Sequence, residues 1–138
     1  MALHRLSMPE SVQAEQNPTY SFVIPVYNEE ESLAELHRRL SLLMERLDGP
    51  TEVIMVDDGS RDNSYAMMLE LNAVDSRFKV VHFSRNFGKE IAVSAGLDLA
   101  RGDAIILLDA DLQDPLELVL EMAVRWHEGY DMVYAKRD

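Results

Sequence analysis

Short apolar runs alternate with longer helical patterns along residues 19–138, and this alternation limits the possible folds more than any other feature. Four apolar runs have the length and composition of strands, at residues 21–27, 52–56, 78–83 and 104–108. Segments with apolar side chains at helical spacing follow these runs. A strand–helix unit that occurs four times predicts a mostly parallel sheet flanked by helices. We therefore expect one α/β domain over residues 19–138.

The helical segments are expected to turn apolar faces toward the sheet. The first covers residues 29–47, the third about 87–101, and the fourth starts at Asp114 as N-cap, with Pro115 as its first helical residue. Their inward side chains are predicted to be Leu33, Leu36, Leu40, Leu43 and Leu47, then Ile91, Ala92, Ala95 and Leu99, then Leu116, Val119, Leu120 and Ala123. A fifth strand is predicted over residues 131–135.

Composition excludes several classes of protein. The formal net charge is −12, which argues against nucleic acid as a partner and against binding of this chain alone to anionic lipid. There is no cysteine, so disulfides, cysteine-bound zinc and a thiol nucleophile are excluded, and a reducing, cytoplasmic setting fits. No apolar run approaches the roughly 18–20 residues of a membrane span. Residues 1–18 are polar and without periodicity, and we expect a flexible tail there.

Polar residues of unusual kinds follow all four strand runs. In a parallel sheet these segments project from one edge, where ligands of such folds bind. Two of the four are acidic, and clustered carboxylates require a compensating cation. The segments are Pro25–Glu29, Asp57–Ser60, Ser84–Lys89 and Asp109–Gln113.

Asp109 and Asp111 are candidate metal ligands. They flank the small Ala110, so both carboxylates can face one ion, and Gln113 can add an amide oxygen. An Asp after a strand is often only a turn or cap residue, but Asp114 already serves as the cap here. Oxygen ligands suit Mg²⁺ or Mn²⁺, and Mg²⁺ is often held by one or two carboxylates together with substrate phosphates. The acidic edge therefore predicts a phosphorylated ligand bridged by a metal.

The other candidates each have two interpretations. Asp57 and Asp58 either cap the following helix or form the second acidic wall of the site. Arg85 and Lys89 are either solvated surface charges or partners of a diphosphate. Tyr27 either packs in the protein or stacks on a base.

Two alternative functions follow from the same residues. A receiver-like signalling domain also gathers Asp residues around Mg²⁺ on a parallel sheet, but its acid pair follows the first strand, whereas here acids follow the second and fourth. A non-catalytic nucleotide-binding module is the other alternative. The phosphate-binding signatures G-x-G-x-x-G after the first strand and G-x-x-x-x-G-K-[ST] are absent, as is the G-x-S-x-G nucleophile turn.

The quoted motifs resemble those of family 2 glycosyltransferases with the GT-A fold. The resemblance rests on Phe22–Glu30, Val56–Ser60 and Asp109–Pro115, and it covers about residues 19–137. The segment Ser84–Glu90 is similar to that of the polyprenyl-phosphate branch, which includes dolichol-phosphate mannose synthase and bacterial undecaprenyl-phosphate sugar transferases. The resemblance implies a Rossmann-like, nucleotide-sugar-binding half of the GT-A fold.

The resemblance also implies roles for individual residues. Asp57 or Asp58 would hydrogen-bond the base, which is usually uracil in bacterial members. Asp109 and Asp111 would form the DXD motif, with Asp111 as the catalytic residue. Nucleotide-sugar contacts would come from Pro25, Tyr27, Glu29, Asp57, Asp58, Arg85, Lys89 and Asp109. The ligands of Mg²⁺ or Mn²⁺ would be Asp109, Asp111 and Gln113, and Arg137 would lie near the diphosphate.

The implied reaction is transfer of a sugar, with inversion, from a nucleotide-sugar donor such as a UDP-sugar to a polyprenyl phosphate. The metal would neutralise charge on the leaving group. A lipid phosphate is already anionic, so it can attack without a general base. Relatives continue beyond this length, so we expect a C-terminally truncated chain that holds the donor-binding part. Contact with the cytoplasmic face of the membrane is expected through the missing region, with a second copy of the chain as a further candidate partner.

Overall fold

A computed structural model describes residues 17–111 and 116–129 of the 138-residue chain. The predicted alternation is confirmed within these ranges. The strands are β1 (Tyr20–Val26), β2 (Thr51–Asp57), β3 (Phe78–His82) and β4 (Ala104–Leu107). The helices are α2 (Leu33–Arg46), α3 (Ser64–Val74), α4 (Lys89–Leu99) and α5 (Glu117–His127). The predicted fifth strand, most of the predicted tail, and the predicted cap at Asp114 and Pro115 lie outside the described residues.

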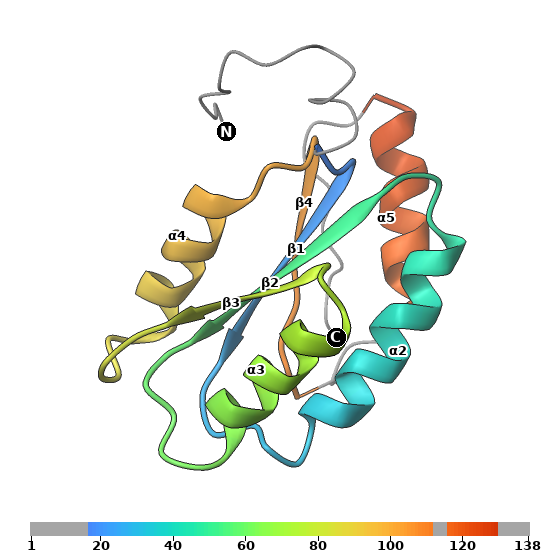
Figure 1. Ribbon diagram of the computed structural model, residues 1–138. Helices are drawn as coiled ribbons and strands as arrows, with labels where there is room; N and C mark the ends of the chain where they lie inside the picture. The colour runs from blue at the N-terminus through green and yellow to red at the C-terminus, as the bar shows by residue number, and fades with distance from the viewer. Residues whose placement is uncertain (1–16, 112–115, 130–138) are drawn as a thin grey trace.

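The described strands form one parallel sheet in the order β3-β2-β1-β4. Figure 1 shows β1 and β2 in the middle of this sheet. Val26 at the end of β1 pairs with Asp57 at the end of β2, so the carboxyl ends of these strands meet at the same edge. The order matches a Rossmann-type sheet, whereas a receiver-like order would place β1 between β2 and β3. The predicted α/β class is therefore confirmed.

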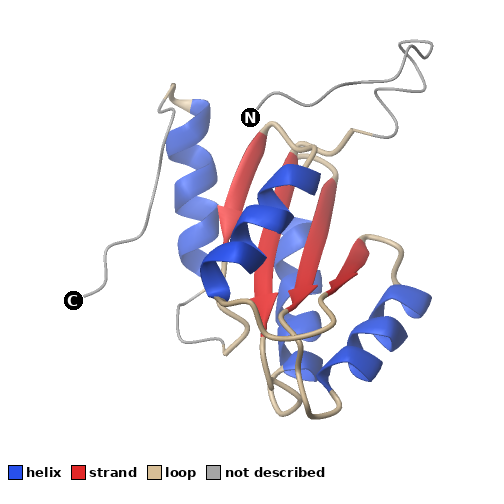
Figure 2. Ribbon diagram, turned by 90° about the vertical axis from the view of Figure 1, so that its left-hand side faces the viewer, coloured by secondary structure: helices blue, strands red, loops and turns tan. Residues whose placement is uncertain are grey.

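Helices cover both faces of the sheet. One face carries α2, α3 and α5, and the other carries α4 (Figures 1 and 2). Because successive side chains of a strand point to opposite faces, Phe22 and Ile24 pack in the larger core while Val23 packs against Ala92 of α4. Within residues 17–111 and 116–129, no helix has the length and apolar character needed to cross a membrane.

Most of the predicted apolar helix faces are confirmed. Leu33, Leu36, Leu40 and Leu43 of α2 are buried, and Leu47 packs against them while partly exposed. In the last helical segment, the buried side chains are Leu116, Val119 and Ala123, and Leu120 packs against the same core.

The predicted inward face of α4 is partly wrong. Ala92 is buried as predicted, but Ile91 and Leu99 are 50% and 52% exposed. The residue that lies closest to the sheet is Gly96, where an added Cβ would be 2.4 Å from Val23 Cγ1. Small residues allow this close approach of helix and sheet, and they turn the larger side chains of α4 outward.

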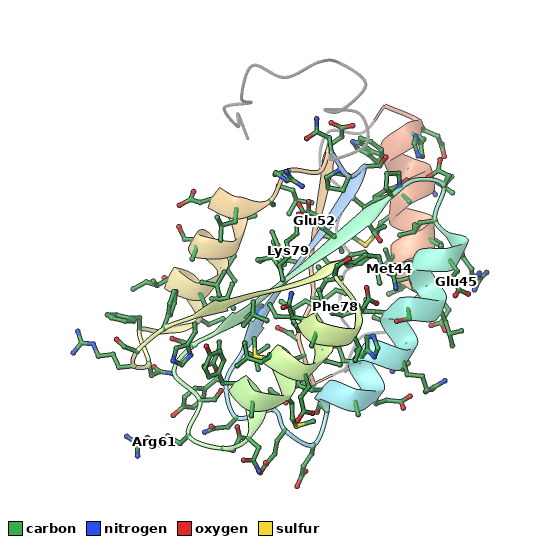
Figure 3. All side chains as sticks on the ribbon, in the orientation of Figure 1. Met44, Glu45, Glu52, Arg61, Phe78 and Lys79 are labelled. Atoms are coloured by element: carbon green, nitrogen blue, oxygen red, sulfur yellow. The ribbon has the colours of Figure 1, made fainter. Side chains whose placement is uncertain are left out.

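The amino end of β2 holds a buried carboxylate in a network of protein donors. Glu52 accepts hydrogen bonds from Ser21 Oγ at 2.6 Å, from the Arg101 backbone N–H at 2.7 Å and from Lys79 Nζ at 2.8 Å. Figure 3 shows Glu52 and Lys79 beside the α4 face of the sheet. Burial raises the pKa of Glu52, but these donors outweigh it and the net pKa is lowered. This network joins β2 to three other segments, which are β1, β3 and the segment after α4, at the edge opposite the predicted site.

Candidate functional site

A hollow of about 350 Å³ opens at the carboxyl ends of β1, β2 and β4. It lies where parallel α/β sheets of this order bind ligands. Its lining residues are Pro25, Val26, Tyr27, Glu29, Asp58, Lys89, Asp109, Ala110 and Asp111. The sequence analysis predicts all of these residues for the site, except Val26 and Ala110. Residues from four separate segments thus converge on one space.

Negative charge dominates one side of this hollow. Burial raises the pKa of Glu29, a Ser32 hydrogen bond lowers it, and the nearby carboxylates of Asp111, Asp62 and Asp109 raise it further. The result is a net increase in the pKa of Glu29, which indicates that an additional negative charge is disfavoured here.

Lys89 brings positive charge to the same space. Its Nζ lies 2.7 Å from Asp109 Oδ1, and the side chain is 66% exposed. Lys89 is the first residue of α4, whereas Asp109 follows β4, so this ion pair connects two segments of the lining. The sequence predicts both residues at the site but not their pairing.

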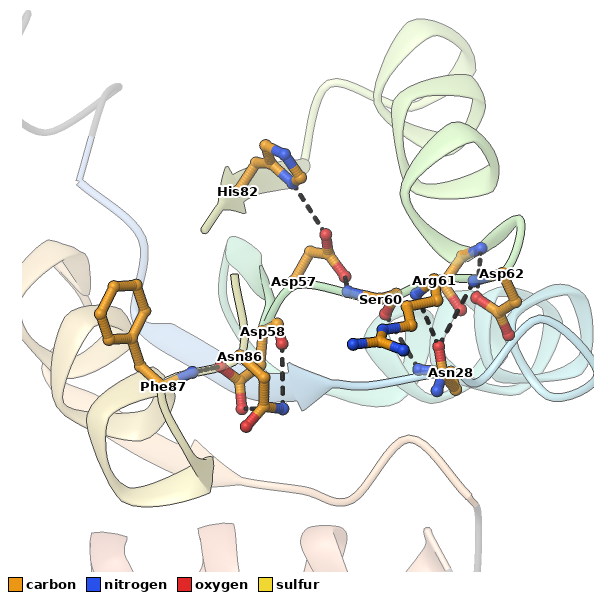
Figure 4. A network of polar contacts seen from close by, with 10 residues as sticks. Asn28, Asp57, Asp58, Ser60, Arg61, Asp62, His82, Asn86 and Phe87 are labelled. Carbon is orange, nitrogen blue, oxygen red and sulfur yellow. Dashed lines mark hydrogen bonds and ion pairs between the residues drawn. The ribbon is translucent and has the colours of Figure 1, made fainter. Parts of the chain in front are cut away.

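Asp58 lies in the lining but is almost fully buried, with 3% of its surface exposed. Its carboxylate accepts hydrogen bonds from the Phe87 N–H at 2.8 Å, the Gly88 N–H at 3.1 Å and Asn86 Nδ2 at 3.2 Å (Figure 4). The N-cap residue of α4 is Gly88. Asp58 therefore connects β2 to the loop before α4.

Asp57 does not line the hollow. It is fully buried, its Oδ1 accepts a hydrogen bond from the Ser60 N–H at 3.1 Å, and its Oδ2 lies 2.8 Å from His82 Nδ1. The His82 ring stacks on Tyr65 with centroids 3.8 Å apart. The sequence gives His82 no role, because only the pairing of β2 with β3, which sets Asp57 opposite His82, reveals the contact.

Arg85 is also outside the lining. Its guanidinium lies 4.7 Å from the centroid of the Phe87 ring, and the side chain is exposed. Gln113 and Arg137, which are predicted to contact the metal and the diphosphate, lie outside the described residues.

Asn28 is a site element that the sequence analysis misses. Its φ is 52°, a left-handed conformation that Asn tolerates better than most residues. Its N–H donates to Ser60 Oγ at 2.9 Å, and its Oδ1 accepts from the Arg61 N–H at 2.8 Å (Figure 4). The next N–H along the chain, that of Glu29, donates to Ser64 Oγ at 2.7 Å. These bonds fasten the loop after β1 to the loop after β2 and hold Glu29 at the hollow.

The donor set of the hollow suits a hard cation that brings ligands of its own. Asp109, Asp111 and Glu29 supply only carboxylate oxygens, which Mg²⁺ and Mn²⁺ prefer. In the part of the chain that the structure describes, no three acidic or His side chains form a ready-made metal site. Mg²⁺ commonly needs only one or two carboxylates when substrate phosphates complete the coordination. These residues therefore fit a metal that arrives with a phosphorylated ligand.

The chain belongs to glycosyl transferase family 2, whose model matches residues 21–138. This membership confirms the resemblance drawn from the sequence motifs. Together with the strand order, it decides against the receiver-domain alternative.

Similar proteins of known sequence are glycosyltransferases. An uncharacterized glycosyltransferase of Bacillus subtilis, YkcC, is 50% identical over 86% of this chain and 36% of its own length. The bactoprenol glucosyl transferase of Shigella phage SfV is 41% identical over 85% of this chain and 38% of its own. An undecaprenyl-phosphate 4-deoxy-4-formamido-L-arabinose transferase of Pseudomonas fluorescens is 45% identical over 82% of this chain and 34% of its own. The chain thus spans about a third of the length of these relatives.

Solved structures with the same fold also include glycosyltransferases. TarS 1-349 of S. aureus aligns with a TM-score of 0.63 and 27% identity, over 80% of this chain and 32% of that one. The mannosyltransferase PcManGT of Pyrobaculum calidifontis, in complex with GDP-Man and Mn²⁺, aligns with a TM-score of 0.62 and 26% identity, over 80% of this chain and 32% of that one. Glucosyl-3-phosphoglycerate synthase of Mycobacterium tuberculosis, in complex with Mn²⁺ and UDP, aligns with a TM-score of 0.59 and 26% identity, over 94% of this chain and 47% of that one.

Proposed function

We propose that this chain is the donor-binding part of an enzyme that transfers a sugar from a nucleoside diphosphate sugar to a polyprenyl phosphate. The observation that carries the proposal is the hollow at the carboxyl ends of the strands, where Asp109 and Asp111 face Glu29 and Lys89. Its charges suit a pyrophosphate bridged by Mg²⁺ or Mn²⁺.

The donor would lie along the hollow with its base and its diphosphate at different walls. Pro25 and Tyr27 supply apolar and aromatic surface for the base, and Tyr27 is 42% exposed. Lys89 supplies a cation near Asp109 for the diphosphate. The similarity to structures that hold UDP or GDP-Man supports a nucleotide at this edge, and we propose UDP as the donor nucleotide.

The chemistry requires loss of a nucleoside diphosphate from the anomeric carbon of the sugar. A divalent metal, when bound, supplies Lewis-acid neutralisation of the leaving diphosphate. Asp109 and Asp111 would hold that metal, with Asp111 as the catalytic residue, and Lys89 would add a fixed positive charge beside the diphosphate. The acceptor phosphate is anionic near neutral pH, so direct attack on the anomeric carbon inverts its configuration without a general base.

The acceptor is proposed from the relatives. Their names specify bactoprenol and undecaprenyl phosphate, which are long lipids and place the transfer at a membrane face. We propose the cytoplasmic face, because nucleotide-sugar donors are cytoplasmic metabolites. Residues of the longer relatives beyond the aligned third would complete the acceptor site, and homo-oligomer formation stays a prediction.

Isothermal titration calorimetry with UDP tests the donor site. We expect binding in Mn²⁺ or Mg²⁺ and loss of binding when a chelator is added, because the acidic hollow repels a bare diphosphate. Equal affinity with and without the chelator would remove the metal-bridge argument. Transfer of labelled sugar to undecaprenyl phosphate, by a longer protein that contains this chain, then separates an enzyme from a non-catalytic nucleotide-binding module.

A further inference from the structure

Lys89 is a cation in a hollow whose other charged lining residues are acids. Within the described part of the chain, the lining contains the carboxylates of Glu29, Asp58, Asp109 and Asp111 beside this single lysine. The Nζ of Lys89 lies 2.7 Å from Asp109 Oδ1. A candidate metal ligand is therefore already paired with a cation of the protein.

The place of Lys89 in its helix does not explain its charge. Lys89 is the first residue of α4 and follows the N-cap Gly88. The helix dipole favours anions at this end and disfavours cations, so Glu90 in the same turn has the favoured sign and Lys89 the unfavourable one. Departures from a local rule of this kind are expected at functional sites. The charge of Lys89 therefore serves contacts outside the helix, in the hollow.

The pair of Lys89 and Asp109 is weak enough to be exchanged. The Lys89 side chain is 66% exposed, and an exposed ion pair changes an equilibrium by about fivefold at most. The backbone before α4 is held against the loop after β2, where a Cβ on Gly59 would lie 2.3 Å from the Arg85 carbonyl carbon. The stem of a lysine is flexible, so the ammonium group can turn to another partner while the backbone stays in place.

A divalent ion on Asp109 would compete with Lys89. An ion bound to the same carboxylate oxygen, at the roughly 2.1 Å that Mg²⁺ requires, would lie at most about 5 Å from Nζ. A carboxylate oxygen can accept both partners, so the competition comes from repulsion between two cations this close. A diphosphate reverses the effect, because its oxygens offer Lys89 an anionic partner. Lys89 therefore disfavours a bare metal ion and favours a metal that arrives with a diphosphate.

We propose that Lys89 and a divalent metal exchange at Asp109, so that the hollow takes the metal together with a diphosphate in preference to the bare ion. Lys89 pairs with Asp109 until the metal binds, and its ammonium group then turns to the diphosphate. This inference rests on the proposed nucleoside diphosphate site and deepens it, because it names the residue that couples metal binding to nucleotide binding.

Calorimetry with Mn²⁺ alone tests the exchange. We expect Lys89→Met to bind Mn²⁺ about two- to fivefold more tightly than the unaltered chain, because the variant removes the competing ion pair. Folding is expected to be unaffected, because the side chain is exposed. An Mn²⁺ affinity of Lys89→Met that is unchanged, lower or undetectable would overturn the proposal.

The same variant is expected to have the opposite effect on the nucleotide. At saturating Mn²⁺, Lys89→Met should bind UDP about tenfold more weakly, because the diphosphate loses a charged hydrogen-bond donor. Linkage then requires that UDP strengthens Mn²⁺ binding by a smaller factor in the variant than in the unaltered chain. A UDP affinity that is unchanged or higher in Lys89→Met would overturn the proposal.

Lys79→Met is the matched control. The Nζ of Lys79 also lies close to a carboxylate, at 2.8 Å from Glu52 Oε1, but at the opposite edge of the sheet. The variant has the same net charge as Lys89→Met, so it measures the effect of net charge alone. We expect it to lower stability and to leave the affinities for Mn²⁺ and UDP unchanged. A gain in Mn²⁺ affinity equal to that of Lys89→Met would assign the gain to net charge and overturn the proposal.

A readout without nucleotide separates failure of this inference from failure of the proposed function. The NMR signal of the Lys89 Cε reports the surroundings of the ammonium group and is assigned by its loss in Lys89→Met. We expect Mg²⁺ to move this signal toward its position in Asp109→Asn and to leave the signal of Lys79 in place. A Lys89 signal that stays in place when Mg²⁺ is bound would overturn the inference even if UDP binds. A signal that moves would support the exchange even if UDP does not bind and the proposed function fails.

Discussion

Glu52 and Asp58 stand at opposite ends of β2 and are equally buried, but the surroundings of the two ends differ. At the amino end, Glu52 is neutralised by Lys79, and the guanidinium of Arg77 lowers the pKa of nearby Asp75 to about 2. At the carboxyl end, burial and neighbouring acids raise the pKa of Glu29. Glu52 and Asp75 are thus stabilised as anions by the protein itself, whereas burial and the neighbouring acids disfavour the anionic form of Glu29 at the hollow.

The largest expected effect is on ligand binding at the carboxyl end. Asp111→Asn removes one negative oxygen from the proposed metal site, and we expect metal-dependent UDP affinity to fall by at least about 100-fold, the upper range for disturbed metal shells. Thermal unfolding is expected to change little, because Asp111 is exposed. Loss of folding together with binding would show that Asp111 is structural and that the site assignment is wrong.

A smaller effect is expected at the amino end, and on stability alone. Glu52→Gln weakens the bonds from Ser21 and Lys79 and turns an amide N–H toward buried donors, which costs about 1–3 kcal/mol of unfolding free energy. Urea denaturation measures this loss, and UDP titration serves as its control. A loss of UDP affinity in the folded variant would break the separation between the two ends.

The smallest effect is a dependence of stability on acid at the amino end. The pKa of Asp75 is about 2 in the folded chain and 3.8 ordinarily, so its contribution is complete above about pH 4 and is lost as pH falls toward 2. We expect Asp75→Asn to flatten the stability curve between these values, measured by denaturant unfolding at each pH. An unchanged slope would mean that the Arg77 pair is too solvated to matter.

Sequence patterns predict those features that depend on spacing along the chain. The Leu33 to Leu43 repeat identifies the buried face of α2, and the acids after β2 and β4 indicate the edge at which the hollow opens. Spacing does not predict which side chains are buried where packing between segments determines the burial. Ile91 and Leu99 have the helical spacing of inward residues, but the close contact of Gly96 with Val23 turns them outward.

The same limit applies within the site. Adjacent in sequence, Asp57 and Asp58 point to opposite faces of the sheet, so one bonds to His82 and the other to the loop before α4. The role of each depends on strand pairing and loop contact, which the sequence does not specify. Asn28 is missed for a related reason, since its bonds run to residues more than thirty positions away.

The contact of Gly59 with the backbone of Arg85 and Asn86 limits which residues this edge of the molecule can tolerate. A Cβ at position 59 would lie 2.3 Å from the Arg85 carbonyl carbon and 2.5 Å from the Asn86 nitrogen, and the φ of 74° is one that residues with a side chain rarely adopt. A substitution at Gly59 must therefore push the loop after β3 away from the loop after β2.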